Sequence, residues 1–354
     1  MNAMYLGGRG LACALGADVP GVLAQWRAGG QPPVPRTVAP GFVWPLHALA
    51  PQQGDWLTRL GRTVRDVVAQ SGALDGARRM PLFVASSSLD VGYEEADQRF
   101  AGDMHAFADA VAAALDWRGP VLTISTACTS AINAVRAAAD WLGGGEAEEA
   151  LVVGIEFDNC FSAGGFGSMQ LLSSTRGRPF GRDRDGLVLG EAVAALRLTR
   201  NPSRWRIAGS GNVVEGADPT GTDANAVIAA CAQALQDSGL GASDIDLVKV
   251  HAAGSPVKDA VELAALRQVF DPLPPLVSFK SLIGHTLGAS GAAELVMLTA
   301  GVEAGIWRAP DYPLDDALDV GFATVAPPRL RHLLLCAIGF GGGHTALVLE
   351  DCGA

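Results

Sequence analysis

Apolar segments of strand length and amphipathic segments of helix length alternate along the chain. A helix places apolar residues three or four positions apart, as in 56–74, where Leu57, Leu60, Val64 and Val67 share one face. Short apolar runs rich in β-branched residues instead indicate buried strands. The pattern predicts strands at 4–15, 80–88, 150–157, 192–198, 205–214, 246–251, 276–280, 333–340 and 344–350. It predicts helices at 19–29, 56–74, 105–115, from Cys128 to about 141, 224–238, 256–270 and from 285 to about 304.

The order of these elements is similar in the two halves of the chain, 1–200 and 201–354. Buried strands separated by helices favour mostly parallel sheets covered on both faces. We therefore expect an α/β fold built by duplication. In that arrangement the helix after Cys128 in the first half corresponds to the helix after His285 in the second.

Two segments lack a clear period. The Pro-rich segment 32–51 predicts a surface loop. Residues 161–191 are rich in Gly, Ser and Arg, and an irregular stretch of this length inside a compact protein is usually functional.

Composition narrows the class of protein. Hydrophobic residues make up 49% and charged residues 18% of the 354 residues, a globular profile. The net charge of −11 argues against a general nucleic-acid binder, which would be basic. The six cysteines include no Cys-x-x-Cys pair and no metal-type spacing with histidines, so we expect no metal site. With no secretory signal and no apolar run of the ~20 residues that span a bilayer, we expect reduced thiols and a cytoplasmic location.

Cys128 lies where a short strand turns into an Ala-rich helix. The free N–H groups and positive dipole end of a helix N-terminus favour a thiolate, and small neighbours leave room for a substrate. This placement suits a nucleophile. A free cysteine is also among the most commonly buried residues, so a packing role is the alternative.

Three further residues lie at predicted strand-to-helix turns: His251 and Lys280, which end strands, and His285, five positions after Lys280. Neutral imidazoles can donate hydrogen bonds to a developing enolate oxygen. Each histidine alone is more often a packed residue. Lys280 is either a strand-end lysine whose head reaches solvent or a buried cation paired with Glu294. The loop 339–343 offers N–H groups for an oxyanion hole or forms a simple hairpin.

Five motifs in order resemble the β-ketoacyl-acyl carrier protein synthases of the thiolase superfamily, in the branch with a Cys-His-His site. They are Ser125-Thr-Ala-Cys128-Thr-Ser-Ala, Arg178-Pro-Phe with Asp183 to Glu191, His251 to Pro256 with Asp259 and Glu262, Ser278 to Ala289, and Gly339-Phe-Gly-Gly. The resemblance implies a duplicated five-layered α/β/α/β/α fold, a homodimer or heterodimer, and acyl carrier protein as partner. It implies no bound cofactor, since the substrate carries phosphopantetheine.

The resemblance also implies roles for residues. Cys128 would accept an acyl group, and His251 and His285 would assist malonyl decarboxylation. Backbone N–H groups of Cys128 and Ile338 would form the oxyanion hole. Supporting residues would be Lys280 with Glu294, and Glu191, Asp259 and Phe340; substrate-binding residues would be Ser255, Gly341 and Gly342.

Departures from the family pattern keep other functions open. Ala253 replaces a hydroxyl residue expected near the pantetheine arm, and the gating phenylalanine maps to Ile338. A non-condensing partner subunit resembling a chain-length factor is the main alternative, and a thiolase a lesser one. Docking of an acidic carrier protein would need a basic patch, for which the candidates are Arg178, Arg182, Arg184, Arg200, Arg204 and Arg206.

Overall fold

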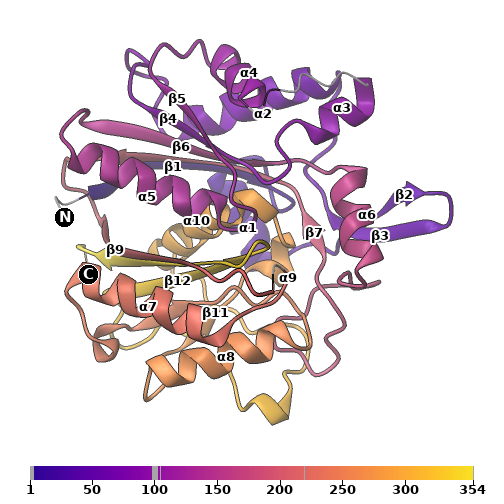
Figure 1. Ribbon diagram of the computed structural model, residues 1–354, viewed down its shortest axis with the longest axis vertical. Helices are drawn as coiled ribbons and strands as arrows, with labels where there is room; N and C mark the ends of the chain where they lie inside the picture. Colours follow the sequence, from indigo (N-terminus) through magenta and orange to yellow (C-terminus); the bar gives the residue numbers. More distant parts are fainter. Residues whose placement is uncertain (1–3, 98–102, 104, 219, 354) are drawn as a thin grey trace.

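The computed structural model describes residues 4–97, 103, 105–218 and 220–353. Ten strands form one sheet that divides into two five-stranded halves (Figure 1). The first half is ordered β5 (Val121–Ile124), β4 (Leu82–Ala85), β6 (Glu149–Glu156), β8 (Ala192–Thr199) and β1 (Met4–Cys13). The second is ordered β11 (Leu276–Val277), β10 (Leu247–Lys249), β12 (His332–Gly339), β13 (Gly343–Asp351) and β9 (Trp205–Val214). The halves join where β1 pairs with β9 through only two residue pairs.

Both halves repeat one pairing pattern. β4 runs parallel to β5 and β6, as β10 does to β11 and β12. β8 pairs antiparallel with both β6 and β1, as β13 does with both β12 and β9. The expectation of mostly parallel sheets is therefore wrong: the sheets are mixed, because only part of the connections are helical crossovers. The common order agrees with a duplicated chain, whereas the boundary at residue 200 stays a prediction.

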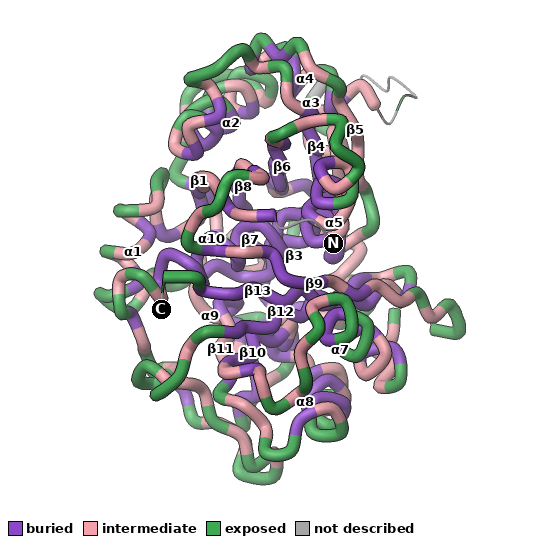
Figure 2. The backbone as a smooth tube through the Cα atoms, turned by 90° about the vertical axis from the view of Figure 1, so that its left-hand side faces the viewer, coloured by how far each residue is buried: buried purple, intermediate pink, exposed green. Residues whose placement is uncertain are grey.

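Helices fill three layers around the sheet halves (Figures 1 and 2). The central layer, between the two sheet halves, consists of helices α5 (Ser130–Gly143) and α10 (Ser290–Glu303). The outer face of the first half is covered by α2 (Trp56–Gln70) and α4 (Ala106–Ala114). The outer face of the second half is covered by α7 (Ala224–Ser238) and α8 (Lys258–Val269). Strand alternation divides the core accordingly, since Val152 of β6 faces the central layer and Val153 the outer one. Every residue of α10 from Ser290 to Gly301 is buried. The predicted five-layered α/β/α/β/α fold is confirmed.

Shorter elements complete the chain. They are α1 (Val19–Ala28), α3 (Val91–Asp97), α6 (Cys160–Ser168), α9 (Lys280–Ile283), β7 (Leu189–Gly190) and the 3-10 turns η1 (Ala242–Asp244), η2 (Leu287–Ala289) and η3 (Asp316–Leu318). None of the helices within the described ranges has the length and hydropathy to cross a membrane.

Three sequence predictions need correction. The segment 32–51 contains a projecting hairpin of β2 (Val34–Ala39) and β3 (Phe42–His47), whose exposed strands carry no buried period (Figure 1). The start of 161–191 lies in helix α6, which the Asn159 side chain caps. Lys280 does not end a strand: β11 stops at Val277, and Lys280 begins α9.

Candidate active site

Cys128 occupies a sharp turn between β5 and α5. Ala127, just before it, has a left-handed φ of 51°, a conformation that costs energy for a residue with a Cβ. Ser130 fixes the turn, since its Oγ accepts from the Thr126 N–H at 2.9 Å and donates to the Ala127 carbonyl at 2.6 Å. The turn brings Cys128 against Gly339, where an added Cβ would lie 3.1 Å from the Cys128 nitrogen. Cys128 is 4% exposed.

His285 lies directly on this thiol. Its Nε2 is 3.0 Å from Cys128 Sγ, and its Nδ1 is 3.0 Å from Ser290 Oγ at the start of α10. The backbone around His285 is fixed as well, because its N–H donates to Val188 and its carbonyl accepts from Gly190. The imidazole is therefore held in one orientation, with one nitrogen toward sulfur and the other toward a hydroxyl.

His251 lies beside His285 beyond the end of β10. The two rings meet edge to face, with centroids 5.2 Å apart. His251 lines the Cys128 pocket, and its Nδ1 has no hydrogen-bond partner among the described residues. Sequence spacing had placed both histidines at turns, and the fold brings them together with Cys128.

Two carboxylates of α8 hold the loop after His251. Glu262 accepts the N–H groups of His251 at 2.6 Å and Ala252 at 2.7 Å. Asp259 accepts from Phe180 at 3.0 Å and from the three N–H groups of 253–255. Burial raises the pKa of Asp259 to about 6 and that of Glu262 to about 7. Glu262, which the motif contained but the site prediction omitted, positions His251 more directly than Asp259 does.

The other predicted supporting carboxylate, Glu191, lies away from the thiol. It accepts the Leu49 N–H at 2.8 Å and the Asp158 N–H at 2.9 Å, and it pairs with Arg59. Sequence reasoning missed a carboxylate nearer the site, Glu156, which accepts the N–H groups of Ser87 at 3.0 Å and Gly288 at 2.9 Å. Both carboxylates act as bridges between loops.

The predicted ion pair between Lys280 and Glu294 forms, and both side chains are 1% exposed. A third group, missed from sequence, joins it: Lys249 of β10 binds the other oxygen of Glu294. The sequence did contain a sign of this role, because Lys249 lies within an apolar strand pattern and is one of only three lysines in the chain.

The protonation states differ from the thiolate expected at a helix N-terminus. Burial raises the pKa of Cys128 to about 11, although the Lys280 charge and the Phe340 N–H lower it. Desolvation, followed by the Lys280 charge, lowers the pKa of His251 and of His285 well below the ordinary value. The ground state is thus a thiol beside two neutral imidazoles.

Phe340, in the loop after β12, is a neighbour of Cys128. Its backbone N–H donates toward the Cys128 sulfur, and its ring stacks on Phe166 with centroids 5.1 Å apart. Ile338 lines the same pocket, and the assignment of its N–H to the oxyanion hole stays a prediction. Gly341 and Gly342 turn away into the hairpin with φ of 81° and 76° and are not among the residues that line the pocket.

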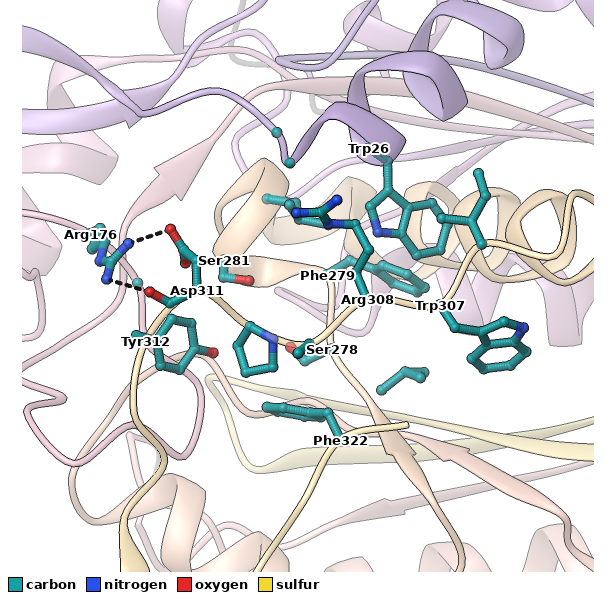
Figure 3. A pocket seen from close by; sticks show the side chains of 18 of the residues that line it. Trp26, Arg176, Ser278, Phe279, Ser281, Trp307, Arg308, Asp311, Tyr312 and Phe322 are labelled. Carbon is teal, nitrogen blue, oxygen red and sulfur yellow. Dashed lines mark hydrogen bonds and ion pairs between the residues drawn. The ribbon is translucent and has the colours of Figure 1, made fainter. Parts of the chain in front are cut away.

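The Cys128 pocket is a narrow cavity of about 40 Å³. Its wall includes both histidines, the predicted Ser255, and Lys258, whose ammonium lies 4.5 Å from the Phe340 ring centroid. A larger cavity of about 250 Å³ is lined in part by residues of the segment 277–282, and Cys128 is not among its lining residues; Figure 3 shows its side chains. Trp26, Phe279, Trp307 and Phe322 give it an aromatic lining.

The arginines proposed as a basic patch do not form a free basic surface. Each is paired with a carboxylate: Arg178 with Asp185, Arg182 with Asp316, Arg184 with Asp315, Arg200 with Glu148, Arg204 with Asp351 and Arg206 with Glu350. Within the described ranges, no group of three or more His, Cys, Asp or Glu side chains is arranged to hold a metal ion.

A buried thiol, a hydrogen-bonded imidazole, a second imidazole in the pocket wall and nearby ammonium groups suit acyl transfer and stabilisation of an enolate. Comparison with known proteins points the same way. Residues 69–203 match the β-ketoacyl synthase N-terminal domain, and residues 206–309 match the β-ketoacyl synthase C-terminal domain.

The chain is 31% identical over 250 residues to 3-oxoacyl-(acyl-carrier-protein) synthase 2 of Mycobacterium leprae, a match that covers 64% of this chain and 60% of that relative. It is 29% identical over 264 residues to nodulation protein E of a Rhizobium species, with 70% and 65% covered. The matched part thus spans about three fifths of the length of these curated relatives.

Among solved structures, the fold superposes with a TM-score of 0.86 on a chain of the complex of the ketosynthase ApeO with its chain length factor ApeC from Xenorhabdus doucetiae. That match covers 99% of this chain and 98% of the other at 24% identity, and it shows a shared fold. Together with the two domain matches, it shows that this chain belongs to the β-ketoacyl synthase family of the thiolase superfamily.

Proposed function

We propose that this chain is a β-ketoacyl synthase that transfers an acyl group to Cys128 and condenses it with a malonyl group bound to acyl carrier protein. The observation that carries the proposal is the 3.0 Å contact between Cys128 Sγ and His285 Nε2, with the His251 ring beside it. The substrate, rather than the enzyme, would carry the phosphopantetheine, and the reaction needs no bound cofactor.

Acyl transfer follows from this contact. His285 Nε2 accepts the thiol proton as Cys128 attacks the acyl thioester, since the ring is neutral. The carbonyl carbon bonds to Sγ, the bond to the pantetheine sulfur breaks, and the proton passes to that departing thiolate. The backbone N–H groups of Cys128 and Ile338 would form the oxyanion hole.

Condensation then uses both imidazoles. The malonyl carbon–carbon bond breaks, CO₂ leaves, and the electron pair forms an enolate whose oxygen accepts hydrogen bonds from His251 and from His285 Nε2. For this donation the His285 ring carries its proton on Nε2, and its Nδ1 accepts a hydrogen bond from Ser290 Oγ. The enolate carbon attacks the acyl-Cys128 carbonyl and releases the cysteine thiolate, which takes one proton from solvent. The product is a β-ketoacyl thioester on the carrier protein.

Acylation of Cys128 tests the proposal. The protein is incubated with short and medium acyl carrier proteins, and the tryptic peptide containing Cys128 is weighed by mass spectrometry. We expect the acyl mass on Cys128, its loss in Cys128→Ala, and its retention in Cys352→Ser, because Cys352 is an exposed cysteine far along the chain. An unmodified Cys128 in folded protein, with any partner subunit present, would refute the proposal.

A non-condensing partner subunit is the second candidate. Two observations favour it: the Cys128 pocket measures only about 40 Å³, and Cys128 is 4% exposed. In this case a related ketosynthase subunit would supply the reactive cysteine. A condensation assay with the related subunit separates the two functions, since a partner subunit stimulates condensation by the other chain even as Cys128→Ala.

The partners and location follow from the same proposal. We propose acyl carrier protein as the substrate carrier and a dimer, either with a second copy or with a related ketosynthase-like chain. A cytoplasmic location is consistent with the six cysteines, none of which is in a disulfide. A thiolase would need a second catalytic cysteine, and Cys336 is buried in the core cluster around α7 and α8, away from this role.

A further inference from the structure

Lys249 is a buried cation in the layer of the catalytic helices. In β10, Leu247 faces the central core and Val248 faces the outer core. Strand alternation therefore directs Lys249 toward the central layer, where α10 carries Glu294. The Lys249 side chain is 1% exposed, in a position where a lysine is rarely found without a partner.

Its ammonium group has two partners. Lys249 Nζ donates to the Cys336 carbonyl at 2.8 Å and to Glu294 Oε2. Lys280 Nζ takes the other oxygen, Glu294 Oε1. One carboxylate therefore bridges two ammonium groups, and this trio, which we call the Lys-Glu-Lys bridge, has a net charge of +1.

The groups facing Lys249 leave much of that charge uncompensated. From α9 and α10 it faces Lys280 and Glu294, and from β12 the Cys336 carbonyl; the Cys336 thiol, whose pKa the hydrogen bond with Cys231 and burial raise well above its ordinary value, interacts with it only electrostatically. From α8, Glu262 feels its charge without a direct contact; two backbone N–H groups bind this carboxyl group, whose pKa burial raises to about 7. The histidines 251 and 285 also feel its field.

Burying an uncompensated cation lowers the stability of the fold, because its desolvation is not repaid by a counter-charge. Such a residue is therefore a candidate for a functional role. Every step proposed for this site creates negative charge: a thiolate, a tetrahedral oxyanion and an enolate. A fixed cation in a dry site stabilises such charge without reorganisation.

We propose that Lys249 is a positioning residue: it holds one oxygen of Glu294 so that Lys280 stays fixed on the other, and it makes the bridge a net positive charge beside Cys128, His251 and His285. The catalytic part of this role rests on the proposed function. Its expected effect on the Cys128 thiol does not, because Lys280, whose charge lowers the pKa of that thiol, shares Glu294 with Lys249 whether or not the chain condenses.

Removing the charge has a definite sign. Lys249→Met keeps a long apolar side chain and changes the net charge of the bridge from +1 to 0. With less positive field, the pKa of Cys128 rises, and those of His251 and His285 also rise toward their ordinary value. We expect a shift of about one pH unit, hence about tenfold slower Cys128 alkylation at a fixed pH below that pKa.

The test measures iodoacetamide alkylation of Cys128, quantified on its peptide, from about pH 6 to pH 10. It uses full-length protein with Cys352→Ser as the common background. Glu294→Gln added to Lys249→Met restores a net charge of +1 through Lys280 alone. We expect Lys249→Met to shift the profile to higher pH and the double variant to return it at least halfway.

Lys249→Gln, which can still donate to the Cys336 carbonyl, replaces Lys249→Met if the latter lowers the unfolding temperature strongly. A Lys249→Met or Lys249→Gln profile that superposes on the parent profile overturns the proposal. So does a double variant that shifts further instead of returning, because a purely structural role predicts added losses. Failure of the proposed function would leave the alkylation shift intact while abolishing acylation in every variant.

Discussion

Replacing Glu294 by glutamine should destabilise the fold far more than an ordinary loss of a salt bridge. The substitution keeps the shape of the side chain and leaves the ammonium groups of Lys249 and Lys280 buried without their shared counter-charge. Removing one partner from a buried ion pair costs about 3–5 kcal/mol. That is a large fraction of the roughly 5–15 kcal/mol by which domains are stable.

The matched control lies on the same helix. Glu303 of α10 pairs with Arg9, but its side chain is 31% exposed. Solvent screens this pair, so Glu303→Gln should cost no more than about 1 kcal/mol. Chemical denaturation followed by tryptophan fluorescence and circular dichroism measures both variants. Adding Lys249→Met to Glu294→Gln should recover part of the loss, because one of the two unpaired cations is removed.

The pH dependence provides a second check on the same reasoning. The two lysine charges outweigh burial and hold the pKa of Glu294 below its ordinary value. Its stabilisation is therefore fully present above the unfolded pKa of about 4.3 and is lost as the pH falls through the lower folded value. The gap between the parent protein and Glu294→Gln should narrow below about pH 4. Equal costs for Glu294→Gln and Glu303→Gln would refute the argument.

Three further predictions concern the site. Alkylation of Cys128 should accelerate about tenfold per pH unit through neutral and mildly alkaline pH, because the thiol pKa is raised to about 11; a plateau by pH 8, about three units lower, would contradict a protonated ground state. Lys258→Met should raise KM for carrier-bound substrate about tenfold with a smaller change in kcat, since the Lys258 ammonium is at the pocket wall beside Phe340. The dependence of KM on salt should also become weaker, because a charge is removed. Unchanged KM and salt dependence would count against this contact. Gly339→Ala should lower the acylation rate about tenfold at a similar unfolding midpoint, because the new Cβ presses on the Cys128 backbone at 3.1 Å. Gly143→Ala, with open space for a Cβ, is its control, and equal acylation rates in the two variants would reject the steric argument.

Hydrophobic periodicity was sufficient to locate the elements that form the core. Strands such as β6 and β9 and helices such as α2 and α7 appear close to their predicted bounds, because each carries an apolar run or face that the fold buries. The equivalence of the Cys128 and His285 turns also followed from element order. It is matched by the repeated strand order of the two halves.

The errors lie where local sequence and tertiary packing disagree. β2 and β3 are largely exposed strands with prolines, so neither alternation nor a buried run marks them. Helix α6 is built from Gly, Ser and Phe residues with low helix propensity, and its cap and packing decide its conformation. A two-residue strand such as β11 is too short for any periodicity to show.

In the site, too, some features could be predicted from the sequence and others depend on tertiary packing. Motif order placed Cys128, His251, His285 and the Lys280–Glu294 pair correctly relative to one another. It did not give the protonation of Cys128, because the desolvation that raises the thiol pKa depends on the packed surroundings. Nor did it give the contact between Lys249 and Glu294, because these residues lie on β10 and α10, far apart in sequence, and only the folded structure brings them together.

The most direct measurement of the central claim is formation of a β-ketoacyl product. Purified chain, with its partner subunit if one is found, is mixed with an acyl carrier protein thioester and isotopically labelled malonyl carrier protein. We predict one CO₂ released per β-ketoacyl thioester formed, lost in Cys128→Ala and in His285→Ala. Product formation that persists at the same rate in Cys128→Ala would contradict the account, because it would place the acyl group on another residue or another chain.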